Sequence, residues 1–427
     1  MSPTGPAERR TAQALDALDA ALRGHAAPLE FRPADDDGAA DWTPRPDVLD
    51  LPHPAAHADP GTADEGASVE RPAVVVRTSG STGTPKQTLL SAAALRASAE
   101  ATAEALGGHG QWLLTLQPSY VAGLAVLSRS LVAGTTPVPL LTGTTDPERF
   151  AAAAEQLTAE RRFVSLVPTQ LSRLLDAGHD RTTAALRRFD RILLGGGASS
   201  DELLERAAAA GLRVVRTYGM SETCGGCVYD GRPLPGVGVS ADADGRISLS
   251  GPMVALGYTD AALSAERFDV DPATGHRRFR TDDLGALSTL SPEDADSPAD
   301  PAPSGATPSN VPRLTITGRL DDVITTGGVK ISAEQVRAVL LEHPEVTDAF
   351  VGGVADRDWG QTVRAAVVLD AASRTEAVLE TLRAAVRERL GPAAAPKSLQ
   401  VLTALPLLAT GKPDRRRLLD LLAVDRP

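Results

Sequence analysis

The sequence predicts an α/β protein with a large N-terminal domain, whose mixed or parallel sheets are flanked by helices, and a small α+β C-terminal domain. Apolar strand-like runs alternate with helical stretches over residues 72–218, which is typical of sheets covered on both faces. A stretch rich in Pro, Ser and Asp, residues 288–312, interrupts the pattern and is expected to be a flexible insertion. Strands and helices resume after it, and 427 residues exceed what one ordinary core accommodates.

The large domain is expected to span residues 72–320, and a short N-terminal segment, 1–71, belongs to it. This segment should form one amphipathic helix, TAQALDALDAALRG, and then irregular, partly mobile structure rich in Pro, Asp and Ala. The expected strands that follow are PAVVVRT (72–78), QWLLTL (111–116), RFVSLV (162–167), DRILL (190–194) and LRVVRTY (212–218). The expected helices are 90–107, 121–134, 146–160 and 199–211, the third with Asp146 as its N-cap and Pro147 at its first position.

The small domain is expected to span residues 321–427. Beyond the insertion, the predicted strands are RLTITGR (313–319), FVGGV (350–354) and VRAAVVL (363–369). The predicted helices are 332–343, with Ser332 and Gln335 as a capping box, and 374–391, closed by Gly391 and Pro392.

Charge and hydropathy exclude several classes of partner. The formal net charge of −12 argues against a nucleic-acid partner or an anionic membrane surface. The N-terminus lacks the apolar core of a secretory signal, and no run approaches the roughly 18 apolar residues of a membrane span. We therefore expect a cytoplasmic protein without membrane insertion. Cys224 and Cys227 form a CxxC without a second pair at zinc-ligand spacing, so a tight turn and a redox pair both stay open.

Lysine is rare in this chain. Of the 43 basic residues only four are lysine, namely Lys86, Lys330, Lys397 and Lys412. A compact ammonium on a flexible stem can perform tasks that a planar guanidinium cannot. Chance retention is the alternative, but three of the four lysines lie inside glycine-rich motifs, which favours a function for them.

The first of these motifs directly follows the predicted strand 72–78. It consists of hydroxyl residues, glycines and a lysine, namely Thr78, Ser79, Gly80, Ser81, Thr82, Gly83, Thr84 and Lys86. Exposed backbone N–H groups, hydroxyls and one cation suit a polyphosphate. The motif is not a Walker A loop, because Pro85 replaces its second Gly and Gln87 its magnesium-binding Ser or Thr. A Ser/Gly linker is the alternative, but a linker would not follow a buried strand and end in a rare lysine.

Five motifs together resemble one family. TSGSTGTPK (78–86), RTYGMSET (216–223), FRTDDLG (279–285), GRLDDVITTGGVKI (318–331) and LLATGKPDRRRL (407–418) match, in order and spacing, the adenylate-forming superfamily of acyl-CoA synthetases, luciferases and peptide-synthetase adenylation domains. The resemblance implies an ATP-dependent carboxylate–CoA ligase. ATP, Mg²⁺, coenzyme A and a small carboxylic acid are the implied cofactors and substrates. The acid would first form an acyl-AMP with release of pyrophosphate, and then a CoA thioester.

The resemblance also implies roles for single residues. Glu222 would be a catalytic residue and the Mg²⁺ carboxylate, with Ser221 beside the phosphates. Asp283 would accept the ribose hydroxyls, with Arg319 as the second ribose contact; Asp282 departs from the family's usual Gly. The adenine would lie between Tyr218 and the turn that begins at Gly195. The other nucleotide-binding residues implied there are Gly196, Gly197, Ala198 and Gly219.

The last two motifs are implied to take part in a change of conformation between the two half-reactions. Lys412 is expected to be the catalytic lysine that bridges the substrate carboxylate and the α-phosphate. Asp321 falls at the family's hinge, so the small domain is expected to rotate after adenylation. That rotation would withdraw Lys412 and bring Gly327 and Gly328 toward a pantetheine channel.

Within the superfamily, the chain looks like the o-succinylbenzoate–CoA ligases of menaquinone biosynthesis. Only 77 residues precede the phosphate motif, and VAGLAVLSRSLVAG, SLVPTQLSRLL and TYGMSETCGGCVYDG agree with that group. Tyr120 stands where a His is frequent, and Gln87 where Gly is common. Tyr120 and Arg129 are candidates for the acyl pocket, Arg129 as partner for a second carboxylate; a solvent-facing or acid-paired Arg129 is the alternative.

Three other functions remain open from sequence. The chain could be another aryl- or acyl-CoA ligase, or a stand-alone adenylation enzyme that loads a carrier protein. It could also be a non-catalytic nucleotide-binding protein, although Lys412, Glu222 and Asp283 are all present. The oligomeric state is open as well, with a homodimer as one alternative.

Overall fold

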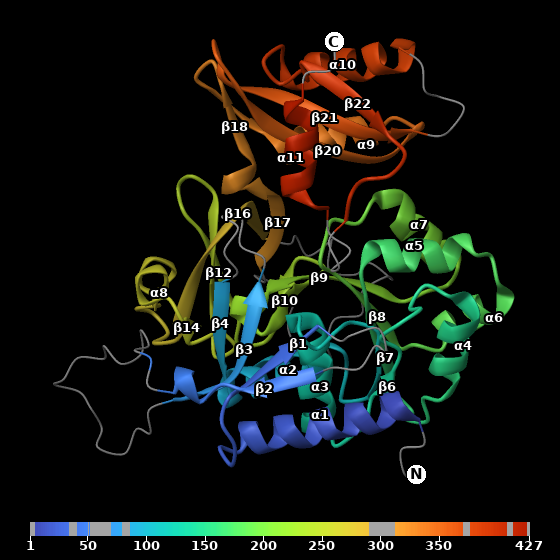
Figure 1. Ribbon diagram of the computed structural model, residues 1–427, viewed down its shortest axis with the longest axis vertical. Coiled ribbons are helices and arrows are strands. Elements are labelled where there is room, and N and C mark those ends of the chain that lie inside the picture. Colours follow the sequence, from blue (N-terminus) through green and yellow to red (C-terminus); the bar gives the residue numbers. More distant parts are fainter. Residues whose placement is uncertain are drawn as a thin grey trace. The chain divides into compact units, whose positions relative to one another are not determined.

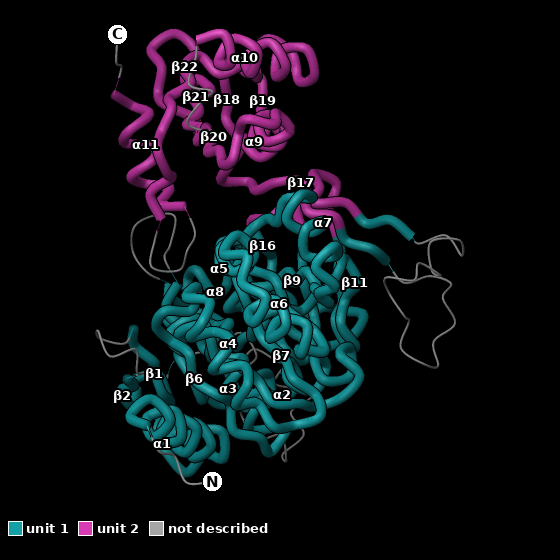
Figure 2. Tube along the Cα trace, turned by 90° about the vertical axis from the view of Figure 1, so that its right-hand side faces the viewer, with its two compact units in different colours: residues 1–240, 248–281, 287–314 teal, residues 241–247, 282–286, 315–427 magenta. Residues whose placement is uncertain are grey.

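A computed structural model describes residues 5–33, 41–49, 51, 70–78, 86–289, 312–369, 376–407 and 413–424. The chain divides into two compact units, coloured separately in Figure 2. Unit 1 comprises residues 1–240, 248–281 and 287–314, and unit 2 comprises residues 241–247, 282–286 and 315–427. The last segment of unit 2 begins at residue 315, whereas the hinge motif predicts the domain boundary at Asp321. The hinge function of Asp321 stays a prediction.

A seven-stranded sheet forms the centre of unit 1, in the order β11-β10-β9-β8-β7-β5-β6 (Figure 1). Its strands are β5 (Gln111–Leu114), β6 (Val138–Pro139), β7 (Arg162–Leu166), β8 (Arg191–Leu194), β9 (Val214–Met220), β10 (Gly225–Tyr229) and β11 (Arg232–Pro233). Strands β5 to β9 are parallel, and β10 turns back antiparallel to β9. This confirms the predicted parallel arrangement, in which apolar runs are buried on both faces.

Helices cover both faces of this sheet. One face packs against α4 (Pro147–Glu155), α5 (Pro168–Asp176), α6 (Asp180–Arg187) and α7 (Asp201–Ala209), around a core that includes Phe150, Leu171 and Phe189. The other face contacts α2 (Ala92–Ala105) and α3 (Val121–Ala133). The predicted N-cap of α4 is confirmed, since the Asp146 side chain accepts a hydrogen bond from the Arg149 amide at 3.0 Å.

A second, five-stranded sheet lies on the far side of α2, in the order β14-β4-β3-β1-β2. Its strands are β1 (Leu29–Arg32), β2 (Asp41–Pro44), β3 (Pro72–Thr78), β4 (Lys86–Ser91) and β14 (Gly257–Tyr258). The predicted strand 72–78 is confirmed as β3. The prediction of irregular structure after the N-terminal helix, α1 (Pro6–Leu22), is wrong for β1 and β2: β1 pairs with β3, and β2 pairs with β1 at the edge of the sheet.

A third sheet has the order β12-β13-β16-β15, with β17 paired to β16. Its strands are β12 (Gly238–Ala241), β13 (Arg246–Ser250), β15 (Phe268–Val270), β16 (Arg277–Thr289) and β17 (Pro312–Arg319), and α8 (Ala261–Arg267) precedes β15. Most of the predicted insertion at 288–312 lies outside the described residues.

Unit 2 contains a five-stranded sheet in the order β19-β18-β21-β20, with β22 parallel to β21. The strands are β18 (Val323–Thr326), β19 (Val329–Ser332), β20 (Val346–Asp356), β21 (Gly360–Leu369) and β22 (Ser398–Leu402), and the helices are α9 (Ala333–Leu341), α10 (Glu376–Leu390) and α11 (Arg415–Ala423). Val336, Leu340 and Val386 pack in its core. The Ser332 side chain caps α9 by accepting from the Gln335 amide at 3.3 Å.

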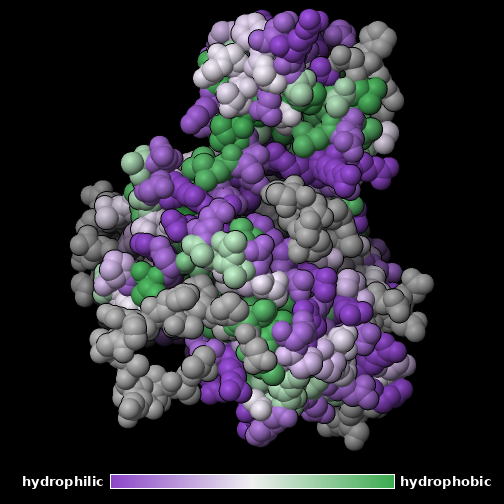
Figure 3. All heavy atoms as spheres, turned by 60° about the vertical axis from the view of Figure 1, so that its left-hand side comes forward, coloured by the Kyte–Doolittle hydropathy of each residue, from purple (hydrophilic) through white to green (hydrophobic). Residues whose placement is uncertain are grey.

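Polar residues predominate on the face drawn in Figure 3, where green hydrophobic residues form small areas among purple ones. Large hydrophobic side chains belong mainly to the cores of the two units, as expected where burial drives folding. Among the described residues, no helix has both the length and the apolar character needed to cross a membrane.

Candidate active site

The two ends of the predicted phosphate motif face each other across two strands of unit 1. Thr78 ends β3, Lys86 begins β4, and the two residues are cross-strand partners in the antiparallel pair. The motif residues Ser79, Gly80, Ser81, Thr82, Gly83 and Thr84 lie outside the described residues. The strand pair therefore fixes the two points from which any phosphate-binding turn must start and end.

Glu222 is buried beside these strands. It lies in a short 3₁₀ turn, Ser221–Thr223, that follows β9, and its side chain accepts a hydrogen bond from the Tyr258 hydroxyl at 2.6 Å. The Lys86 ammonium lies 5.7 Å from the centre of the Tyr258 ring. Tyr258 is on β14 and pairs with Thr88 of β4, so sheet pairing places the phenol near Lys86 and its hydrogen bond reaches the Glu222 carboxylate.

Tyr258 is a site residue that our sequence reasoning missed. The chain has only four tyrosines. The rarity argument that singled out the lysines applies equally to them and would have pointed to Tyr258.

The predicted adenine turn follows β8 and lies next to β9. Gly195 donates its amide to the Leu166 carbonyl at 3.2 Å, and a Cβ there would meet the Thr217 hydroxyl at 2.3 Å. Gly196 has φ +83°, which favours glycine. Gly219 is equally constrained, because a Cβ there would lie 2.1 Å from the Gly225 carbonyl. Gly219 thus lets two backbones approach closely beside Tyr218 on β9, and Gly195 leaves room for the Thr217 hydroxyl.

The predicted ribose contacts meet within unit 2. Arg319 donates to Asp283 at 2.7 Å and, through its Nε, to Asp321 at 2.8 Å. Burial acts to raise the pKa of Asp321, but hydrogen bonding to Arg319 and the nearby positive charges outweigh it, so the pKa lies below its ordinary value. Arg415 donates to the Asp321 carbonyl at 3.0 Å and pairs with Asp322. The predicted hinge residue is thus held through both its side chain and its backbone.

Gly327 and Gly328 form the turn between β18 and β19, with φ of +54° and +81°. The Gly327 amide donates to the Trp359 carbonyl at 3.0 Å, and a Cβ on Gly327 would lie 2.6 Å from the Trp359 ring. Trp359 is 53% exposed, so the turn presents an aromatic face to its surroundings. Lys412 lies outside the described residues.

The two acyl-pocket candidates are close in sequence but differ in setting. Tyr120 is the N-cap residue of α3, whereas Arg129, two turns further along this helix, is buried. The Arg129 guanidinium lies 5.0 Å from the centre of the Trp112 ring and donates to the Tyr229 hydroxyl at 3.4 Å. Arg129 is therefore not solvent-facing, and its part in an acyl pocket stays a prediction.

Cys224 and Cys227 are free and buried. Burial raises the pKa of both thiols, to about 12 for Cys227. A reactive thiol needs the opposite shift. Cys224 has φ +55° directly after the Glu222 turn, which favours the tight-turn interpretation over a redox pair.

The donors around Glu222 fit a magnesium ion that binds together with a nucleotide. Among the described residues, no group of three or more His, Cys, Asp or Glu is arranged to hold a metal. Mg²⁺ usually takes one or two protein carboxylates and completes its shell with phosphates and water. One buried carboxylate near a phosphate motif matches that pattern.

Comparisons with known proteins define the class. Residues 9–259 match the family profile described as AMP-binding enzyme, and residues 335–412 match that of the AMP-binding enzyme C-terminal domain. The chain belongs to the AMP-binding enzyme family. This confirms the predicted resemblance and, with the solved structures, the predicted fold.

Named relatives narrow the comparison. The chain is 44% identical over 347 residues to a probable 2-succinylbenzoate–CoA ligase of Mycobacterium tuberculosis, covering 81% of this chain and 83% of that protein. It is 31% identical over 398 residues to the 2-succinylbenzoate–CoA ligase of Bacillus licheniformis, with 87% and 74% covered. Among solved structures, o-succinylbenzoate coenzyme A synthetase (MenE) from Bacillus subtilis, in complex with ATP and a magnesium ion, matches with a TM-score of 0.64 and 27% identity, with 82% and 70% covered.

Replacing Tyr258 by Phe removes the hydroxyl that orients Glu222 while keeping the ring beneath Lys86. Groups that orient a metal ligand typically contribute 10–100-fold to metal affinity. We expect the Mg²⁺ concentration for half-maximal pyrophosphate release to rise by about tenfold. Tyr229→Phe is the matched control and should leave this concentration unchanged; the same shift in both variants would contradict the assigned role.

Proposed function

We propose that the protein is an ATP-dependent o-succinylbenzoate–CoA ligase, which forms an acyl-AMP and then the CoA thioester. The observation that carries the reaction class is the buried Glu222, held by Tyr258 beside Lys86, in a chain of the AMP-binding enzyme family. The names of the relatives at 44% and 31% identity support the acid. Such a ligase would serve menaquinone biosynthesis.

The first half-reaction needs a better leaving group on a carboxylate. A substrate carboxylate oxygen attacks the α-phosphorus of ATP. The bond between this phosphorus and the oxygen that bridges it to the β-phosphate breaks, and pyrophosphate leaves. Thr78 and Lys86 would hold the phosphates, and Glu222 would hold Mg²⁺ when the nucleotide is bound. The metal supplies charge neutralisation on the phosphates. Lys412 would place a cation between the acid and the α-phosphate, where negative charge develops.

Unit 2 would contribute to both half-reactions. Asp283 would accept hydrogen bonds from the ribose hydroxyls, and Arg319 holds this carboxylate in place at 2.7 Å. After adenylation, rotation at Asp321 would withdraw Lys412 and admit the CoA thiol beside Gly327 and Gly328. The thiol sulfur then attacks the acyl carbon, and AMP leaves. Alternation of this kind lets one enzyme favour adenylate formation first and thiol access second.

The test is pyrophosphate and AMP release with ATP and a panel of aryl and acyl acids, with and without CoA. We expect o-succinylbenzoate to give the highest kcat/KM and AMP formation that depends on CoA. No turnover of this acid, together with turnover of another, would overturn the substrate assignment. Activity that ignores CoA but requires a carrier protein would overturn the ligase assignment in favour of carrier loading.

Gly327→Ala should impair the second half-reaction selectively. The added Cβ would meet the Trp359 ring, and φ at this position disfavours any side chain. Strain of this kind costs on the order of 1–3 kcal/mol, so we expect thioester formation from isolated acyl-AMP to slow about tenfold while adenylation is unchanged. Gly391→Ala is the matched control, since φ is +89° there but nothing lies within 4 Å of the added Cβ. An equal loss in both half-reactions would contradict the role of the turn.

A further inference from the structure

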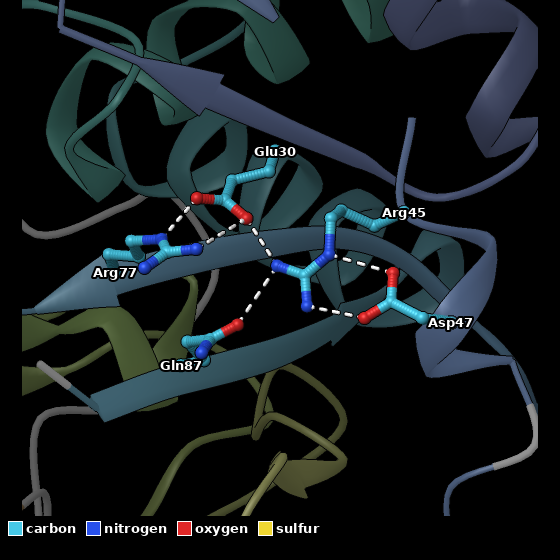
Figure 4. Close-up of polar contacts among 5 residues, drawn as sticks. All are labelled: Glu30, Arg45, Asp47, Arg77 and Gln87. Carbon is cyan, nitrogen blue, oxygen red and sulfur yellow. Dashed lines mark hydrogen bonds and ion pairs between the residues drawn. The ribbon is translucent and has the colours of Figure 1, made fainter. Parts of the chain in front are cut away.

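A cluster of polar side chains lies next to Thr78 and Lys86, at the adjacent residue pair of the strands β3 and β4. Figure 4 shows its members, which come from three separate segments: Glu30, Arg45, Asp47, Arg77 and Gln87. We call it the Glu30 cluster. Its centre is the Glu30 side chain, which is only 2% exposed. Glu30 is on β1, where it pairs with Val75 of the parallel strand β3.

Two arginines neutralise the buried carboxylate. Arg77 donates its Nε to one Glu30 oxygen and a terminal nitrogen to the other at 3.3 Å, and Arg45 donates to the second oxygen. Burial alone would raise the pKa of Glu30, but the hydrogen bonds and charges of Arg77 and Arg45 outweigh it and lower the pKa. Glu30 is therefore an ionised hub that joins the N-terminal segment to β3.

Arg45 extends the cluster to the neighbouring strand. The nitrogen that contacts Glu30 also donates to the Gln87 side-chain oxygen at 2.9 Å, on β4. The remaining nitrogens of Arg45 donate to both oxygens of Asp47, at 2.8 and 2.7 Å. Because Asp47 binds the Arg45 guanidinium through two hydrogen bonds, the guanidinium has little freedom to rotate. The nitrogen that donates to Gln87 is therefore held in a defined position.

The cluster acts at one particular level of the strand pair. Arg77 and Gln87 are cross-strand partners, and the next pair along the same strands is Thr78 and Lys86. Glu30 thus holds β3 through Arg77 and, through Arg45, holds β4 at Gln87. Both strands are therefore held at the residue next to the one proposed to bind the phosphates, Arg77 beside Thr78 and Gln87 beside Lys86.

Stability is a weak reason for this arrangement. Desolvation largely cancels the attraction within a buried ion pair, and apolar replacements of similar volume are frequently as stable. The apolar positions next to the cluster, such as Val75 and Leu89, already join this sheet to its core. What a charged, hydrogen-bonded cluster adds is a defined geometry, which a phosphate site requires.

We propose that the Glu30 cluster is a positioning device for ATP: it fixes Thr78 and Lys86 at the spacing that the phosphates require. The proposal rests on the proposed function of these two residues. The members of the cluster are positioning residues, since each acts through β3 or β4. The N-terminal segment, which supplies Glu30 and Arg45, thereby contributes to nucleotide binding.

The test is Glu30→Gln, which keeps the volume but removes the charge. We expect KM for ATP to rise about tenfold, with kcat, KM for the acid and KM for CoA each within twofold of wild type. The dissociation constant of ATP, measured by calorimetry without the acid, should rise by the same factor. A purely structural role would lower the melting temperature without this split between substrates.

Two further variants and one control sharpen the test. Gln87→Ala removes only the contact from Arg45. It should raise KM for ATP about threefold and leave the melting temperature at its wild-type value. The double variant Glu30→Gln/Gln87→Glu returns a carboxylate to Arg45 and should recover part of the loss. Asp269→Asn is the control, because it weakens a comparable two-bond contact with Arg278 elsewhere in unit 1, at 2.7 and 2.8 Å, and should leave KM for ATP unchanged.

Three outcomes would overturn the proposal. Glu30→Gln and Gln87→Ala with unchanged ATP affinity would make the cluster structural only. A rise in KM for all three substrates alike, or the same rise in Asp269→Asn, would point to a general disturbance. A wild-type protein that binds no ATP in calorimetry would refute the proposed function itself, and the positioning proposal with it; normal wild-type binding with unaffected variants refutes only the latter.

Discussion

Replacing Lys412 by alanine is expected to slow acyl-adenylate formation by about 10²–10³-fold, the usual effect of removing one group that stabilises developing charge. Thioester formation from preformed acyl-AMP should stay within a few-fold of wild type, because the lysine is proposed to withdraw before that step. The two half-reactions are measured separately, by pyrophosphate release and by CoA consumption with added acyl-AMP. The difference between them is the diagnostic quantity.

Lysine rarity supplies the matched control for this experiment. Lys397 contacts Asp356 at 3.5 Å and lies 5.2 Å from the centre of the Trp359 ring, and it belongs to none of the five motifs. Lys397→Ala should therefore leave adenylation unchanged. Lys412→Arg tests the compact ammonium, and we expect it to recover only part of the rate. Equal loss of both half-reactions in Lys412→Ala would contradict the role of this lysine.

Glu222→Gln is expected to have the second large effect, a loss of adenylation on the order of 10²–10³-fold at low Mg²⁺. The amide keeps an oxygen that can accept from Tyr258 but removes the charge that attracts the metal. Raising the Mg²⁺ concentration should recover part of the rate, whereas raising the acid concentration should not.

A binding measurement separates this effect from misfolding. Calorimetry of ATP with and without Mg²⁺ should show that Glu222→Gln loses the affinity gained from the metal but keeps the metal-free affinity. Ser221 precedes Glu222 in the same turn, and a collapse of this turn would lower both affinities together. Such a joint loss would refute the metal role and leave Glu222 as a structural partner of Tyr258.

Local signals predicted those parts of the fold that depend on neighbouring residues. The run of three valines before Thr78 gave β3 with its observed bounds, and Asp146 with Pro147 gave the start of α4. The N-terminal strands β1 and β2 were missed for a physical reason. Each has only four residues. In addition, β1 is stabilised by pairing with β3, in which Val74 is the partner of Leu29, and a partner so distant in the chain leaves no local signal.

In the candidate site, too, the sequence predicts the motif residues but not the long-range contacts between them. Sequence motifs predict site roles for Glu222, Asp283 and Arg319 from the order of the motifs along the chain, and these roles stay predictions. The contacts that orient them are long-range: Tyr258 is 36 residues from Glu222, and Arg319 is 36 residues from Asp283. Contacts of this kind depend on strand register, which motif order does not contain. The sequence does not decide between a buried and a solvent-facing Arg129 for the same reason, because its burial against Trp112 depends on tertiary packing.

The order β14-β4-β3-β1-β2 has a consequence for how the protein is made. The strand that begins with Lys86 is flanked on one edge by β3 and on the other by β14, which ends at Tyr258. A ribosome must therefore translate well past the middle of the chain before β14 can pair with β4 and complete this sheet. Such non-local closure is slow, because chain entropy is lost before pairing rewards it. Nascent chains that end before residue 258 should accordingly gain no protection from ATP against proteolysis, since the buried partner of Glu222 has not yet been synthesised.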